Sequence, residues 1–284
     1  MKFRLNTRGV IGLVAAGALL ALPACSSGSD SGDAAPATAT GGVQLVDPSA
    51  LTVCTHLSYK PFEFKDDSGN VVGFDVDLAD LTAKKLGVET KIVDIDFASM
   101  TSGAVFAAKK CDIGMGAITI TDKRKQSVNF SDNYFAATQA LLTKKDSGIT
   151  DLSGLRDKKL GVQTDTTGQA YAEKNKADNG YQIIVFDDLP TELTGLQSGR
   201  VDAIINDNGP LLDFVKDNPD LAVAKEFETG EQYGFIGQKD DENATKLMDV
   251  FNEQLSAAIK DGTYATIYEK WFGAKPEVLP TPAG

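Results

Sequence analysis

Two short segments carry side chains that suit the two charged ends of a small zwitterion. The first, residues 119–124 (TITDKR), follows an apolar run and has Thr121 as the expected N-cap of a helix, so backbone N–H groups and the Arg124 guanidinium converge on one anion. A guanidinium is planar and matches both oxygens of a carboxylate, and Thr119 adds a hydroxyl. The spacing equally allows an Arg124 that lies on the helix surface and pairs with Asp122 or solvent.

The second segment, residues 206–210 (NDNGP), ends the apolar run 201–205. A carboxylate at the C-terminal edge of a parallel strand faces the crevice in which open α/β sheets bind ligands, so Asp207 is a candidate partner for an ammonium group. Propensity alone favours a turn-forming aspartate ahead of Asn-Gly-Pro. A further turn, residues 163–168 (QTDTTG), offers N–H and hydroxyl groups to the same carboxylate.

The residue patterns that carry catalysis are missing from the sequence. The single histidine, His56, excludes an HExxH metal motif and has no serine partner in a nucleophile elbow, and no GxxxxGK[ST] loop occurs. The segment 114–119 (GMGAIT) lacks the third glycine of a dinucleotide-binding fingerprint. We therefore expect neither an enzyme nor a cofactor or metal. Two acidic pairs are interpreted as solvated edges or helix caps: Asp75 with Asp77, and Asp94 with Asp96.

Composition narrows the class of protein further. The 284 residues are 42% hydrophobic and 24% charged, which excludes whole-chain disorder, collagen-like repeats and a multi-span membrane protein. The formal net charge of -12 argues against a nucleic-acid partner, because phosphate recognition needs clustered cations.

The N-terminus has the pattern of an export signal followed by a lipid-attachment site. Three cations precede an apolar run, residues 10–22, that is too short to span a membrane comfortably. Residues 22–25 (LPAC) resemble the lipobox of bacterial lipoproteins, in which cleavage leaves Cys25 as a lipidated first residue. A plain signal with an incidental cysteine is the alternative. We expect a signal peptide over residues 1–24, then the lipidated cysteine and a flexible tether over residues 25–42.

The two other cysteines are predicted to form a disulfide. If Cys25 is lipidated, Cys54 and Cys111 remain as a pair in an oxidising compartment, where a disulfide is the default. Two buried reduced thiols are the alternative, because sequence alone does not place the Cα atoms within bridging distance.

Alternating strands and helices make up the body of the chain in two series. The first series has strands at 51–54, 91–93 and 112–118 and helices at 77–86 and 100–110. The second has strands at 160–162, 183–186 and 201–205 and helices at 168–175 and 193–197. Such alternation predicts two parallel α/β units and hence two lobes. A strand at 233–237 and helices at 242–260 and 265–271 then complete the first lobe.

Because the chain returns from the second lobe to complete the first, it must cross between the lobes twice, near residues 133–138 and 228–233. Two such crossings predict a hinge. Lobe 1 is expected over residues 43–133 plus 234–275, lobe 2 over residues 138–228, and a C-terminal tail over residues 276–284.

Several blocks of the body resemble one family, the amino-acid-binding proteins of ABC importers, also called family 3 extracellular solute-binding proteins. They are residues 59–64 (YKPFEF), 73–78 (GFDVDL), 118–124 (ITITDKR), 130–134 (FSDNY), 161–163 (GVQ), 166–168 (TTG), 199–203 (GRVDA), 261–264 (DGTY) and 270–273 (KWFG). The resemblance implies the two-lobed fold of type II periplasmic binding proteins, with a mostly parallel sheet flanked by helices in each lobe and two hinge crossovers.

The same resemblance implies a ligand site. Arg124 and Thr119 match the residues that hold the ligand's α-carboxylate, and Asp207 matches the acid that holds its α-ammonium. Tyr59 and Phe97 match the aromatic rings that enclose its side chain. The rest of the predicted site consists of Ala117, Thr166, Thr167, Gln163, His56 and Asn206.

His56 bears on which amino acid is bound. It stands where relatives that hold basic amino acids or glutamine often carry an aspartate, and an imidazole does not neutralise a buried cation. Together with Gln163 and Asn206 it predicts a neutral, hydrogen-bonding pocket, so we expect glutamine or asparagine first and glutamate next, since a protonated His56 pairs with a carboxylate. A structural histidine is the alternative.

The resemblance further implies the working cycle and its partners. We expect a monomer, anchored by its lipid to the extracytoplasmic face of the cell membrane, that closes on a free amino acid and delivers it to the permease subunits of an ABC transporter. Two rivals stay open. One is a secreted enzyme similar to cyclohexadienyl dehydratases, with His56 as acid or base, and the other is a ligand-sensing lipoprotein.

Overall fold

The computed structural model of the chain describes residues 42–281. The predicted signal peptide, the lipidated Cys25 and nearly all of the tether lie outside these residues. None of the described helices combines the length and the apolar character that a membrane span requires.

The first lobe is built on a five-stranded sheet with the order β4-β1-β5-β12-β6. Strand β1 lies between β4 and β5 and runs parallel to both, whereas β12 is antiparallel to β5 and β6. The strands are β1 (Ala50–Thr55), β4 (Glu89–Asp94), β5 (Ile113–Gly114), β6 (Val128–Phe130) and β12 (Ile236–Gln238). A small hairpin of β2 (Phe64–Lys65) and β3 (Val71–Val72) precedes the first helix.

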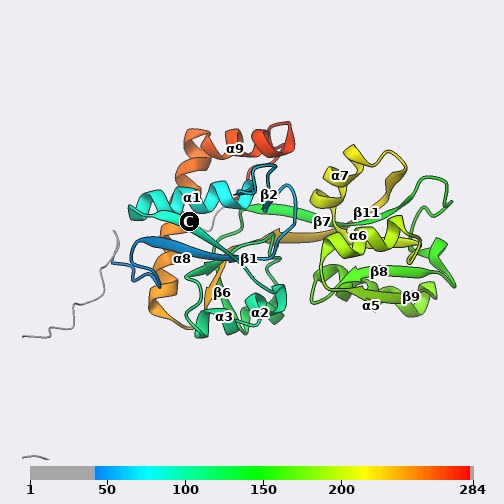
Figure 1. Ribbon diagram of the computed structural model, residues 1–284, viewed down its shortest axis with the longest axis horizontal. Coiled ribbons are helices and arrows are strands. Elements are labelled where there is room, and N and C mark those ends of the chain that lie inside the picture. The colour runs from blue at the N-terminus through cyan, green and yellow to red at the C-terminus, as the bar shows by residue number, and fades with distance from the viewer. Residues whose placement is uncertain (1–41, 282–284) are drawn as a thin grey trace, which may run out of the picture. The chain divides into compact units, whose positions relative to one another are not determined.

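Helices cover both faces of this sheet, so β1 is buried along its whole length. One face packs against α1 (Phe74–Leu86), α8 (Glu242–Asp261) and α9 (Thr263–Phe272), whose side chains form one core with Leu51 and Val53. The other face packs against α2 (Phe97–Thr101) and α3 (Ala104–Ala107) around Cys54. Figure 1 shows α1, α8 and α9 gathered around this sheet.

The second lobe is built on a sheet with the order β11-β7-β10-β8-β9. The strands β10 (Ala203–Asp207), β8 (Lys159–Gln163) and β9 (Gln182–Phe186) are parallel, and β7 (Phe135–Lys144) and β11 (Leu221–Tyr233) are antiparallel additions. The surrounding helices are α5 (Thr167–Asn179), α6 (Leu189–Gln197), α7 (Asn208–Asp217) and a 3-10 turn, η1 (Leu152–Leu155).

The long strands β7 and β11 connect the two lobes. They pair with each other from Phe135 and Tyr233 at one end to Lys144 and Leu221 at the other. The first pair belongs to the core of the first lobe, whereas Leu221 belongs to a core of the second. In Figure 1 both strands can be followed from the first lobe into the second. The predicted two-lobed α/β fold is confirmed.

Three predicted elements differ from the structure. The helix expected over residues 100–110 is split into α2 and α3, because Gly103 has a left-handed backbone with φ of 80°. The strand expected over residues 112–118 keeps only β5, because Gly116 and Ala117 also have positive φ. The strand expected over residues 233–237 is the end of β11 and the start of β12, separated by Gly234 and Phe235.

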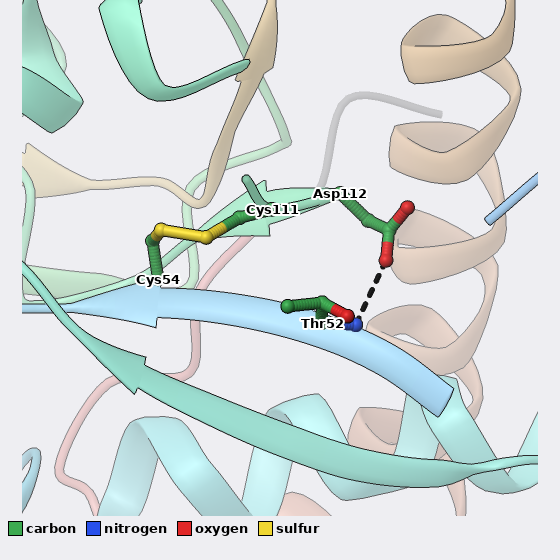
Figure 2. The surroundings of a disulfide bond; sticks show 4 residues. All are labelled: Thr52, Cys54, Cys111 and Asp112. Atoms are coloured by element: carbon green, nitrogen blue, oxygen red, sulfur yellow. Dashed lines mark hydrogen bonds between the residues drawn. A yellow bond between two sulfur atoms is a disulfide. The ribbon is translucent and has the colours of Figure 1, made fainter. Parts of the chain in front are cut away.

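A disulfide fastens β5 to β1. Cys54 lies in β1 and Cys111 just before β5, with a Cα–Cα distance of 5.7 Å, so the predicted bond is present. Asp112 adds a second tie, since its carboxylate accepts from the backbone N–H of Thr52 at 2.8 Å (Figure 2). The segments that leave the C-terminal ends of β1 and β5 are therefore held side by side.

Candidate functional site

The C-terminal ends of strands from both sheets border one cavity of about 370 Å³, including the space at its mouth. All of the predicted ligand-binding residues except Asn206 line it, together with two residues that were not predicted, Glu63 and Gly116.

Arg124 provides the cationic side of the cavity. It lies on α4 (Asp122–Lys125), where the Thr121 side chain accepts from its backbone N–H at 3.1 Å, so the predicted N-cap is present. The guanidinium is placed by a hydrogen bond from Nη1 to the Thr119 carbonyl at 2.9 Å and by the Phe97 ring, whose centroid lies 5.2 Å from Cζ. The residue is only 8% exposed, and burial lowers the pKa of its guanidinium while the nearby carboxylates oppose that change.

The surface alternative for Arg124 is therefore wrong. Asp122, which was considered as its partner, instead lies 3.9 Å from the Lys125 ammonium. Nη2 of Arg124 donates to the carbonyl of Asp165 at 3.0 Å, which belongs to the turn after β8 in the second lobe. The guanidinium thus touches both lobes.

Asp207 provides the anionic side. It ends β10 and precedes α7, but its carboxylate makes no capping bond to that helix. Instead the carboxylate accepts from the Gln139 amide and the Tyr233 hydroxyl and is 5% exposed. Burial, and after it the charge of Glu231, raise the pKa of Asp207 to about 6. The turn-forming role does not account for this carboxylate, which faces the cavity.

Threonine hydroxyls stand between these two charges. Thr166 is the N-cap of α5, where its side chain accepts from the backbone N–H of Gln169 at 3.0 Å. Thr167 begins the helix, and its hydroxyl lies 3.4 Å from that of Thr119 in the other lobe. The first N–H groups of α5 are thus available to an anion held by Arg124, whereas the hydroxyls of Thr119 and Thr167 donate to the carboxylate of Glu231.

Asn206 lies behind the cavity and does not line it. Its amide, 1% exposed, donates to Glu192 at 2.8 Å and accepts from the Tyr59 hydroxyl at 2.7 Å. The amide also lies 3.4 Å from the Gln163 side chain, which does reach the cavity. Asn206 therefore positions the ring of Tyr59 and the amide of Gln163.

His56 presents an acceptor at the cavity. Its Nδ1 lies 3.0 Å from the carbonyl of Ile95, so it donates to that oxygen, and a neutral imidazole then keeps Nε2 as an acceptor. Nε2 is buried without a hydrogen-bond partner among residues 42–281.

Glu63 adds a carboxyl group that the sequence did not reveal as part of the site. It is 1% exposed and lines the cavity, and its Oε2 has no hydrogen-bond partner within the described part of the chain. Burial raises the pKa of Glu63 well above its ordinary value, and the charge of Asp75 adds to this. A glycine is needed beside it, because a Cβ on Gly116 would lie 3.2 Å from Glu63 Oε1 at a φ of +139°.

The interpretation of Asp75 as a solvated edge is wrong. Its carboxylate is fully buried and accepts from the N–H groups of Gly116 and Ala117 at 3.1 and 3.0 Å and from the Tyr134 hydroxyl at 2.7 Å. Burial raises the pKa of Asp75 to about 6. Asp75 therefore fixes the unusual backbone that forms the floor of the cavity.

The other acidic residues fit the expectation of caps and edges better. Asp96 caps α2 by accepting from the N–H of Ser99 at 2.8 Å. Asp77 accepts from the Lys270 ammonium and the Trp271 indole, each at 2.7 Å.

Three polar residues around Asp207 were also missed by the sequence: Gln139, Glu231 and Tyr233. Gln139 lies on β7 and the other two on β11. The sequence predicted crossings near residues 133–138 and 228–233 and a strand over residues 233–237, but not two long connecting strands. The cavity is bordered by the guanidinium of Arg124 and by the carboxyl groups of Asp207 and Glu63, which suits a dipolar guest. The described residues hold no group of three His, Cys, Asp or Glu side chains that suits a metal ion.

Comparison with known proteins shows the family of the chain. Residues 51–274 match the model of bacterial extracellular solute-binding proteins, family 3. A probable histidine-binding protein of Neisseria gonorrhoeae is 34% identical over 277 residues, which cover 94% of this chain and 97% of that protein. Solved structures of an ancestral arginine-binding protein, bound to arginine and to glutamine, have TM-scores of 0.73 and 0.72. They are 41% and 40% identical and cover 79% of this chain and 99% and 98% of theirs. The chain therefore belongs to the family 3 bacterial extracellular solute-binding proteins.

Proposed function

We propose that this chain is the substrate-binding component of an ABC importer and that it captures a free amino acid between its lobes, residues 43–133 with 234–275 and residues 138–228. One observation carries the proposal: the buried guanidinium of Arg124 and the buried carboxylate of Asp207 border the same cavity from different lobes. An amino acid brings the complementary charge to each. Burying both pairs together is favourable because neither charge is left without a partner.

Each end of the ligand has its own set of groups in this proposal. The α-carboxylate meets Arg124 and the backbone N–H groups at the N-terminus of α5, at Thr166 and Thr167. The α-ammonium meets Asp207. The ligand first docks on the lobe that carries Arg124, Tyr59 and Phe97, and rotation about β7 and β11 then brings the second lobe onto it.

The side-chain end of the pocket supports a ligand that carries N–H donors. His56 Nε2 and Glu63 Oε2 are buried acceptors without partners among residues 42–281, and Gln163 reaches the same space. Unpaired buried acceptors are costly, so a donor that reaches them binds favourably. Glutamine and asparagine, the amino acids predicted from the sequence, provide an amide for this purpose.

Arginine is the second candidate, and Glu63 favours it. The carboxyl of Glu63 lies in the cavity, and a guanidinium bound beside it would favour the ionised carboxylate, against the rise in pKa that burial causes. The named ligands of the relatives include histidine, arginine and glutamine, which all carry side-chain N–H donors.

Delivery and location complete the proposal. The loaded protein docks on the permease subunits of the importer, and the lipid on Cys25 keeps it at the extracytoplasmic face of the membrane. Binding without turnover distinguishes it from the dehydratase-like enzyme, which would release a product. A ligand-sensing lipoprotein would bind the same amino acid but would not support its uptake.

Calorimetric titration of the full chain with the twenty amino acids tests this proposal. We expect saturable binding of glutamine or arginine with no product formed. Arg124→Ala leaves a buried carboxylate unpaired, which costs about 3–5 kcal/mol, so Kd should rise at least about a hundredfold. Lys125→Ala is the matched control, because Lys125 lies on the same short helix with an exposed side chain.

Two results would contradict the proposal. The first is the absence of binding by any amino acid. The second is an Arg124→Ala variant that binds as tightly as the Lys125→Ala control.

A further inference from the structure

Glu231 is a charged side chain that the proposed ligand contacts do not use. It lies on the connecting strand β11, two residues before Tyr233, and side chains two apart share a face of a strand. The Tyr233 hydroxyl donates to Asp207, so this face of β11 is turned toward the ligand site.

An irregularity in β11 sets where Glu231 lies along that face, opposite Ala137. Phe227 pairs with Gln139 and Glu231 with Ala137, so four steps on β11 match two steps on β7. Gly230, inside this bulge, has a φ of +66°, a conformation that side chains rarely adopt. Bulges of this kind redirect side chains beside functional sites.

One carboxylate oxygen of Glu231 joins residues from both lobes. Its Oε2 accepts from the Thr119 hydroxyl of the first lobe at 3.3 Å and from the Thr167 hydroxyl of the second at 3.1 Å. It also accepts from the Gln139 amide at 3.0 Å, and the same amide nitrogen donates to Asp207. Rotation of the lobes away from each other must therefore break hydrogen bonds to a charged acceptor.

We propose that Glu231 is a positioning residue that ties the hydroxyls of Thr119 and Thr167 together across the lobes and so lengthens the life of the closed, loaded state. The inference rests on the proposed function, since Thr119 and Thr167 both line the proposed ligand cavity. Glu231 does not line the cavity, so it acts on the ligand through the residues that it holds.

A matched control lies on the same strand. Glu226 also accepts two side-chain hydrogen bonds, from Thr138 at 3.2 Å and from Asn208 at 3.0 Å. Thr138 is on β7 and Asn208 begins α7, so these bonds do not reach the first lobe. A Glu226 variant therefore separates the effect of losing a carboxylate from β11 from the effect of losing the interlobe hydrogen bonds.

The rate at which the bound amino acid dissociates tests the proposal. Hydrogen bonds to charged groups are worth about a factor of ten or more, so Glu231→Ala should raise koff about tenfold. Glu231→Gln keeps a neutral acceptor and should raise it less, by about threefold. Glu226→Gln should leave koff unchanged.

Hydrogen–deuterium exchange of the ligand-free chain provides a readout that needs no ligand. With Glu231→Ala the backbone amides of residues 117–121 and 163–169 should exchange several-fold faster, and with Glu226→Gln they should not. The proposal is overturned if both Glu231 variants leave koff and this exchange unchanged, or if Glu226→Gln matches them. If the unaltered chain binds no amino acid, the proposed function fails, and the exchange data alone then decide the role of Glu231.

Discussion

Ligand affinity is expected to fall in acid, because Asp207 must be ionised to hold an ammonium group. Burial, with the charge of Glu231 as the next cause, raises the pKa of Asp207 from 3.8 to about 6. A bound ammonium favours the ionised carboxylate, so binding lowers that pKa again. Binding and loss of the proton are therefore linked, and the affinity depends on pH.

The size of the effect follows from the pKa of about 6. At pH 7 roughly nine-tenths of the Asp207 carboxyls are ionised, and affinity is close to its maximum. At pH 5 roughly one in eleven is ionised, so Kd should be about tenfold higher, a loss of about 1.4 kcal/mol. The ligand's own α-carboxylate and α-ammonium keep their charges over this range.

Calorimetry at pH 5, 6 and 7 measures this slope, and Asp207→Asn is the control. The variant should bind more weakly at pH 7 but should lose the part of the pH dependence that Asp207 causes. Any slope that remains in that variant comes from groups other than Asp207. Equal affinity of the unaltered chain at pH 5 and pH 7, or an unchanged tenfold slope in Asp207→Asn, would refute the reasoning.

Two further predictions concern stability. Burial raises the pKa of Glu192 from 4.5 to about 8, so the folded state loses about 5 kcal/mol as pH rises through that interval. Glu192→Gln should remove this loss, and urea unfolding at pH 6 and pH 9 should show a gain that grows with pH; parallel pH profiles would contradict it. Replacing Cys54 and Cys111 together by serine opens a loop with a sequence separation of 57, which should lower the free energy of unfolding by about 4 kcal/mol. A loss below about 1 kcal/mol in the same assay would show that the disulfide contributes little.

The sequence predicted the parts of the site that depend on position relative to a strand end. Arg124 and Asp207 each follow an apolar run, and the C-terminal ends of parallel strands meet at one edge of a sheet. Their burial was not predictable from spacing, which left a surface arginine and a turn-forming aspartate as equal or better alternatives. The resemblance to a known family favoured a ligand-binding arginine and aspartate over these alternatives, and the structure then showed that both side chains are buried.

The connecting strands were missed for a physical reason. Strand prediction depends on a side-chain period of two, and β11 departs from it between Val223 and Lys225 and again between Phe227 and Glu231. Its charged residues also resemble a solvated loop, so Gln139, Glu231 and Tyr233 had no signal that placed them beside Asp207.

Asp75 was missed because its partners lie about forty residues away in sequence. The N–H groups that hold its carboxylate belong to Gly116 and Ala117. No local sequence pattern predicts the positive φ values of these two residues. A carboxylate in the first turn of a helix is usually solvated, and only the fold brings that turn against the loop after β5.

The connecting strands also limit how this molecule can be re-engineered. Gln139, Glu231 and Tyr233 are both part of the polypeptide bridge and neighbours of the ligand's charged end. Consider a chimera that takes a whole lobe from a relative but takes β7 and β11 from the other parent protein. Its cavity wall would be intact, but the residues that support this wall would not match it. Biosensor designs built on this scaffold should therefore transfer β7 and β11 together with the lobe that carries Asp207.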